Sequence, residues 1–314
     1  MILLPSDTVL GGFLISQFCI GVIGNSLIFV LHLYTSLIQP HLKKPIDYIF
    51  MHLTMVNTLT IIITLIPNIM SSFGVKHVLD DVGCKAVLYL SRVTRGLSMC
   101  TTSFLSTFQA ITISLSNSKC AWLKSKLSKW IVPSFISFWI INMVFYMFVI
   151  KNTKAKSNFT LFGPGFSHVY CENERFEDGR SRLYLSLMII RDLLLVVFIT
   201  GMSLCMVSLL YRHHRRAQHV HSSSLSSQLS PENKAIHSIL LLITCFVFFY
   251  CANNVMTLFA FYTPEKIPTM EGISGILSSF YPTICPFLLM KNNKIISQFI
   301  SPLALMRFNF LRGH

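Results

Sequence analysis

Seven long apolar runs constrain this chain more than any other feature of its sequence. Each has about the 20 mostly apolar residues that an α-helix needs to cross a bilayer. Backbone groups in lipid must be paired within their own segment, which favours helices over open strands. The sequence therefore predicts an all-α integral membrane protein with a seven-helix bundle. The expected spans are Val9–Leu33, Tyr48–Phe73, Ala86–Leu115, Trp130–Ile150, Leu183–Tyr211, Ala235–Tyr262 and Met270–Met290.

The distribution of charge predicts how the spans are oriented. Charged residues make up 12% of the chain, against roughly 25% in soluble domains. If the N-terminus is outside, the inner segments hold fourteen Lys and Arg residues and two acids, whereas the outer segments hold nine of each. Because basic residues near span ends stay in the cytoplasm, we expect an outer N-terminus and a cytoplasmic C-terminus in the plasma membrane. The net charge of +14 then needs no nucleic-acid partner.

The segments outside the spans give three further expectations. The start of the chain, "MILLPSDTVL", has no basic region, so the first run should remain as a signal anchor. The longest outer loop, residues 151–182, contains the sequon Asn158–Thr160, which predicts an N-glycan on Asn158. Residues 291–301 place apolar side chains on one helical face, which predicts an amphipathic helix at the membrane surface. One domain would then cover residues 1–301, and residues 302–314 would form a short cytoplasmic tail.

Two of the nine cysteines are expected to form a disulfide. Most of the others lie within spans, where a free cysteine packs as a small apolar residue. Cys120 lies at the inner face, in a reducing compartment. Cys84 lies at the outer mouth of the third span and Cys171 lies in the long outer loop. Oxidising surroundings favour a bridge between them that would hold this loop over the bundle.

Charged residues inside the spans are the candidates for a functional site. The third span contains "SRVTRG", with Arg92 and Arg95, and the fifth span places Arg191 and Asp192 at a similar depth. Intramembrane charges are costly, face the bundle interior and usually pair. In one interpretation, Asp192 pairs with Arg92 or Arg95 as a structural lock.

In the other interpretation, the deeper Arg95 points into a ligand pocket and binds an electronegative group of a small molecule, such as a carboxylate, sulfate or carbonyl. A planar guanidinium suits such oxygen groups. The pocket would be lined by Arg92, Arg95, Met99, Arg191, Asn254 and Tyr281.

The sequence offers little support for an enzyme, a transporter or a metal protein. No HExxH, Gly-x-Ser-x-Gly or paired intramembrane acids occur, and no cofactor is expected. The histidines of "RHHRR" lack the spacing of metal ligands. A transporter would be expected to show more paired charges, or a Gly/Pro-broken pair of helices at mid-membrane. A small-molecule transporter therefore remains only a weak alternative.

Several stretches together resemble one family of receptors. Seven spans, an outer N-terminus and the expected Cys84–Cys171 bridge look like a G protein-coupled receptor, and "GVIGNSLIFV" is similar to the rhodopsin-like first span around Asn25. Other positions depart from that pattern. Gln109 stands in place of the acid-Arg-Tyr triplet, Asn57 replaces a sodium-binding Asp, and the sixth span has no proline.

These departures resemble the vomeronasal type 1 receptor family, together with "RVTRGLSMCTTSFLSTFQAITIS", "SPENKAIHSILLLITCFVFFY", "IIRDLLLV" and "FYPTICPFLL". The resemblance runs from about residue 10 to residue 300 and implies a pheromone receptor that couples to an inhibitory-type heterotrimeric G protein. A bitter-taste-like chemosensory receptor, which also lacks the triplet, is the nearest alternative within receptors.

Overall fold

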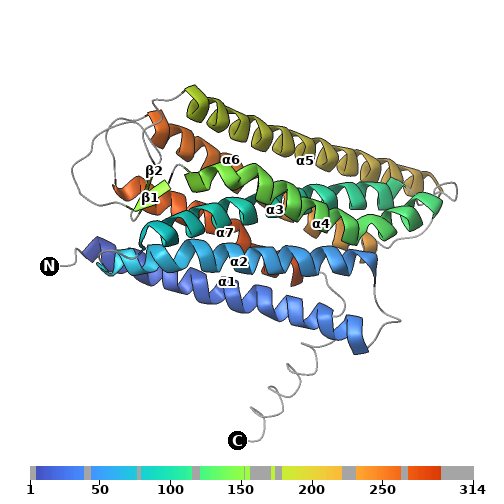
Figure 1. The fold of residues 1–314 in the computed structure, drawn as a ribbon. Coiled ribbons are helices and arrows are strands. Elements are labelled where there is room, and N and C mark those ends of the chain that lie inside the picture. Colours follow the sequence, from blue (N-terminus) through green and yellow to red (C-terminus); the bar gives the residue numbers. More distant parts are fainter. Residues whose placement is uncertain are drawn as a thin grey trace, which may run out of the picture.

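A bundle of seven α-helices makes up most of the molecule. The computed structural model describes residues 5–38, 44–75, 79–114, 121–151, 153–155, 171–173, 179–220, 231–262 and 268–290. The helices in these segments lie alongside one another (Figure 1), and each expected span coincides with one of them. The elements are α1 (Pro5–Ile38), α2 (Pro45–Ser72), α3 (Asp81–Ser114), α4 (Ala121–Lys151), β1 (Thr153–Ala155), β2 (Cys171–Asn173), α5 (Gly179–Val220), α6 (Pro231–Tyr262) and α7 (Pro268–Met290).

Five of these helices are long and apolar enough to cross a membrane. The qualifying stretches are Thr8–Ile38, Pro45–Ser72, Lys126–Met147, Ser186–Leu209 and Ile273–Met290, and α6 has a shorter apolar stretch, Leu240–Met256. The structure thus confirms that the chain forms a helical membrane bundle. The helix α3 contains two arginines and many serines and threonines.

The polar composition of α3 follows from its place at the centre of the bundle. It packs against α2, α4 and α5 and touches α6. Its Ser and Thr hydroxyls largely donate to carbonyls one turn earlier, as in the bond from Thr101 to Leu97 O (2.7 Å). Because protein rather than lipid surrounds most of α3, its side chains need not be apolar.

The helices α1 and α7 are joined through the buried Asn25. Its side-chain amide donates to Gly21 O and to Pro282 O, both at 2.8 Å. Gly24 allows the close approach, since a Cβ there would lie 2.9 Å from the ring of Pro286. The polar residue that the sequence places in the first span therefore fixes the position of α7.

A disulfide and two short strands close one end of the bundle. Cys84, in the first turns of α3, is bonded to Cys171 at the start of β2, with a Cα–Cα distance of 5.7 Å. The strand β2 pairs antiparallel with β1, with Ala155 opposite Cys171. Both strands lie at the end of the bundle where α1 begins (Figure 1), called here the disulfide end.

Some sequence expectations differ from the structure, and others lie outside it. The strands were not expected, because three-residue pairs inside a polar loop leave no alternating pattern to detect. The helices α5 and α6 also extend beyond the expected spans, to Val220 and from Pro231. Hydropathy detects only their apolar middles, because a polar sequence can continue a helix once it has left the lipid.

Asn158 and residues 291–301 lie outside the described residues.

A buried histidine holds α4 against α2 and α3. The Thr101 hydroxyl donates to Leu97 O, so its oxygen accepts from His52 Nδ1–H (2.9 Å). This arrangement fixes the tautomer and leaves His52 Nε2 to accept from Trp139 Nε1–H (3.1 Å). The imidazole also stacks on Phe135 at 4.1 Å between ring centroids.

We expect Trp139→Phe to destabilise the protein, because the change removes the only donor to a buried ring nitrogen in the described part of the chain. Leaving such a group unpaired costs about 1–3 kcal/mol. The measurement is the apparent melting temperature in detergent. Trp130→Phe is the control, since Trp130 is 57% exposed at the bundle surface. Equal melting temperatures for the two variants would contradict the role assigned to the His52–Trp139 bond.

Candidate functional site

Arg95 is the centre of a polar group in the middle of the bundle. It lies eleven residues after Cys84 on α3, so about 16 Å from the disulfide at about 1.5 Å per residue. Its side chain is only 12% exposed. A buried guanidinium is stable only when nearby groups accept its hydrogens.

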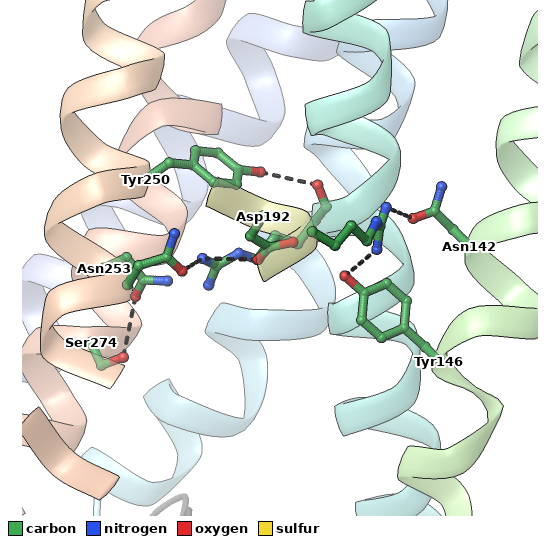
Figure 2. Close-up of polar contacts among 9 residues, drawn as sticks. Asn142, Tyr146, Asp192, Tyr250, Asn253 and Ser274 are labelled. Atoms are coloured by element: carbon green, nitrogen blue, oxygen red, sulfur yellow. Dashed lines mark hydrogen bonds and ion pairs between the residues drawn. The ribbon is translucent and has the colours of Figure 1, made fainter. Parts of the chain in front are cut away.

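Two asparagines of α6 accept the hydrogens of the Arg95 guanidinium. Arg95 Nη2 donates to Asn254 Oδ1 at 2.5 Å. With its amide oxygen turned toward Arg95, Asn253 accepts from both Nη1 and Nη2. The other amide atom of Asn253 lies 3.3 Å from Ser274 Oγ on α7 (Figure 2). One arginine thus connects α3 to α6 and, through Asn253, to α7.

Tyr250 strengthens the connection between α3 and α6. Its hydroxyl donates to the backbone carbonyl of Arg95 at 3.1 Å, and its ring lies 5.0 Å from the guanidinium carbon. The cation therefore faces an aromatic ring as well as two amides, which lowers the cost of burying it.

Asp192 of α5 is the acid that faces Arg95. Its Oδ2 lies 3.9 Å from Arg95 Nη2, and the residue is 6% exposed. Of the two partners expected from the sequence, the structure pairs Asp192 with Arg95. Arg92 lies nearly one turn nearer the disulfide end, half-buried, and interacts electrostatically with both Arg95 and Asp192.

Arg191 does not join the Arg95 group, although the sequence interpretation placed it in the same pocket. It faces α4, where Nη2 donates to Asn142 Oδ1 (2.6 Å) and Nη1 donates to Tyr146 Oη (2.7 Å). Its guanidinium also lies 4.8 Å from the Phe145 ring (Figure 2 shows the Asn142 and Tyr146 contacts). The physical reason is the helical repeat: adjacent residues point about 100° apart, so Arg191 and Asp192 cannot face the same helix.

Gly96 allows α4 to bring Asn142 to this position. A Cβ at Gly96 would lie 2.0 Å from Asn142 Oδ1 and 3.0 Å from the ring of Tyr146. The same oxygen accepts from Arg191, while Asn142 Nδ2 donates to Phe138 O (2.7 Å). Contact between the backbone of α3 and α4 thus positions the residues that hold Arg191.

Met99 and Tyr281 lie below the Arg95 group, on the side away from the disulfide. Both are fully buried in one apolar core cluster with Phe246 and Tyr250. The Tyr281 ring lies 4.8 Å from that of Phe246 and 6.4 Å from that of Tyr250. Of the expected site residues, the structure therefore brings Arg95, Asn254 and Asp192 together and places Met99 and Tyr281 beneath them.

Sequence reasoning missed five residues that contact Arg95, Arg191 or their partners: Asn142, Tyr146, Tyr250, Asn253 and Ser274. A signal existed for two of them. Asn142 and Tyr146 are four residues apart in an apolar span, so they share one helical face. Among the described residues, no group of three or more His, Cys, Asp or Glu side chains is placed to hold a metal ion.

The fold and this buried polar group define a multi-pass helical membrane protein. A family model described as the vomeronasal organ pheromone receptor family matches residues 8–302. The chain therefore belongs to the vomeronasal type 1 receptor family, whose members are G protein-coupled pheromone receptors.

Individual relatives agree with this assignment. The chain is 33% identical to vomeronasal type-1 receptor 4 of Homo sapiens over 92% of its own length and 95% of that protein. It is 32% identical to vomeronasal type-1 receptor 1 of Gorilla gorilla gorilla, over 89% of this chain and 79% of the relative. It is 29% identical to olfactory receptor class A-like protein 1 of Danio rerio, over 91% and 90% respectively.

We expect Gly96→Ala to lower stability, because the added methyl group would clash with Asn142 and push α4 away from α3. Overpacking of this kind typically costs about 1–3 kcal/mol. The melting temperature in detergent would be compared with that of Gly201→Ala, where a Cβ on α5 meets no atom within 4 Å. If both alanine variants melt at the wild-type temperature, the close contact between α3 and α4 is not required.

Proposed function

We propose that this protein is a plasma-membrane receptor that binds a small pheromone or other semiochemical within the disulfide-end half of the helix bundle. Binding would activate a heterotrimeric G protein, of the inhibitory type, at the opposite face. Membership of the vomeronasal family supports the receptor class. The ligand class, the ligand position and the type of G protein are the parts proposed here.

Arg95 carries this proposal. A positive charge in the middle of a span is costly and in most proteins serves binding or transport. The nearest acid lies 3.9 Å away, beyond normal hydrogen-bond distance. A ligand oxygen that bonded to Arg95 could compete with Asn253 and Asn254, and this would change how α3 is tied to α6. Binding and a change in helix packing are thus coupled at one residue.

The proposed orientation places the disulfide end outside the cell. It rests on the excess of Lys and Arg in the segments at the opposite end, and on the oxidising conditions that a disulfide needs. The basic inner segments would then face an acidic surface of the G protein or anionic lipid. No observation in the described part of the chain favours a transporter or a bitter-taste-like receptor.

We expect Arg95→Met to reduce agonist potency by at least about tenfold, since a hydrogen bond to a charged group contributes about 1.5–3 kcal/mol. The agonist potency of Arg95→Lys should lie between those of the wild type and Arg95→Met, because an ammonium keeps the charge but cannot bond in the same fork geometry. The readout is ligand-dependent inhibition of cAMP synthesis at matched surface expression.

Lys85→Met is the matched control for these variants, because Lys85 lies on the same helix near the disulfide. A second possible result would show that Arg95 is needed only to hold the helices together. In that case both Arg95 variants would fail to reach the cell surface, and Asp192→Asn in the same chain would restore them.

The orientation predicts an N-glycan on Asn158. Asn158→Gln should abolish a glycosidase-sensitive shift in gel mobility, whereas Asn152→Gln in the same loop should leave it unchanged, because Asn152 is not in a sequon. If this loop can be labelled only after the cell is permeabilised, it lies in the cytoplasm and the true orientation is the opposite of the one proposed.

A further inference from the structure

The Arg95–Asp192 pair leaves two buried polar atoms without a hydrogen-bond partner in the described part of the chain. They are Arg95 Nε, which is a donor, and Asp192 Oδ1, which is an acceptor. Buried polar atoms are normally paired, and an unpaired charged group is especially costly. Two such atoms of opposite type on one ion pair therefore point to a group that the protein itself does not supply.

The packing explains why Arg95 and Asp192 do not form a hydrogen bond with each other. Arg95 uses Nη1 and Nη2 for the asparagines of α6, which draws the guanidinium away from α5. Arg191 cannot reach across to Asp192, because Asn142 and Tyr146 hold both of its terminal nitrogens on α4. The carboxylate is therefore left with a contact at 3.9 Å and an oxygen that no described residue bonds.

The chemistry of the two atoms selects the ligand group. The N–H of Arg95 needs an acceptor and the carboxylate oxygen of Asp192 needs a donor. A hydroxyl group does both at once. A ketone or an ether could bond only to Arg95, and a protonated amine could bond only to Asp192. A sulfate or an ionised carboxylate could accept from Arg95 but has no hydrogen to donate to Asp192.

Three positions about one turn from the pair, on α5 and α3, carry apolar side chains. One turn before and after Asp192 on the same face of α5 lie Met188 and Val196, and Met99 lies one turn beyond Arg95 on α3. All three are buried, and none carries a hydrogen-bonding group that a polar ligand body could use. Such surroundings suit a hydrocarbon body carrying one polar group.

From these observations we infer that the Arg95–Asp192 site binds the hydroxyl group of a small apolar alcohol. The oxygen accepts from Arg95 Nε–H and the hydroxyl hydrogen is donated to Asp192 Oδ1. This inference rests on the receptor function proposed above. Among the oxygen groups that Arg95 could bind, it ranks the hydroxyl ahead of the carbonyl, carboxylate and sulfate.

The test uses matched compounds in which only the polar group changes. The probes are the alcohol, ketone, methyl ether and sulfate ester of three skeletons: menthane, cyclododecane and decahydronaphthalene. Each is applied to cells that express the full-length receptor, and G protein activation is recorded. The expected result is that the alcohol of at least one skeleton is more potent than its ketone and ether by about tenfold or more, as expected for a hydrogen bond to a charged group.

Asp192→Asn tests the second half of the site. The amide is nearly the same size as the carboxylate, but it carries no charge and can donate as well as accept. The preference for alcohol over ketone should therefore fall by about tenfold, and the sulfate ester should gain potency. Asp81→Asn is the matched control, because Asp81 lies exposed at the start of α3. The ranking in the wild-type receptor tests the inference even if the variant does not reach the surface.

The outcomes separate the two proposals. Ketones, ethers or sulfates that match or exceed the alcohols would overturn the hydroxyl assignment and leave the receptor function in place. An alcohol preference that is unchanged in a well-expressed Asp192→Asn would remove Asp192 from the site. A receptor that no compound activates, with surface expression confirmed, would count against the proposed function and the hydroxyl assignment together.

Discussion

The burial of the Arg95 guanidinium is the constraint on which the rest of the site depends. A charge at this depth must be surrounded by groups that accept its hydrogens, and no single neighbouring helix supplies enough of them. The two α6 asparagines, the ring of Tyr250 and the carboxylate of Asp192 share the task. The position of α3 between α5 and α6 is therefore an electrostatic requirement as well as a matter of packing.

The consecutive residues Arg191 and Asp192 show how one helix serves two neighbours. Because they point about 100° apart, fixing either residue fixes the rotation of α5. Asn142 and Tyr146 hold Arg191 on α4, and this turns Asp192 toward α3. Asn142 can lie there only because Gly96 has no side chain. A glycine on α3 thus helps to set where the carboxylate of α5 points.

The sequence predicted the helices well because the bilayer imposes a simple rule on length and hydropathy. It also predicted the depth of Arg95 and Asp192, since the helical rise is constant. It could not predict which helix each side chain faces. That depends on the rotation of each helix, which is set by contacts such as that between Gly96 and Asn142. The structure therefore places Arg191 against Asn142 and Tyr146 of α4 rather than beside Arg95.

The aromatic side chains beneath Arg95 show how a change at the site would spread. Tyr250 bonds to the Arg95 backbone and its ring stacks on Phe246 at 4.1 Å, and Phe246 in turn meets the edge of Tyr281 on α7. Closely packed rings have little free volume, so a shift of Tyr250 must be accommodated by its neighbours or by movement of α6. A ligand that drew Arg95 away from its asparagines would first change the contact between Arg95 and Tyr250. The site is thus built where a small displacement on α3 is felt by both α6 and α7.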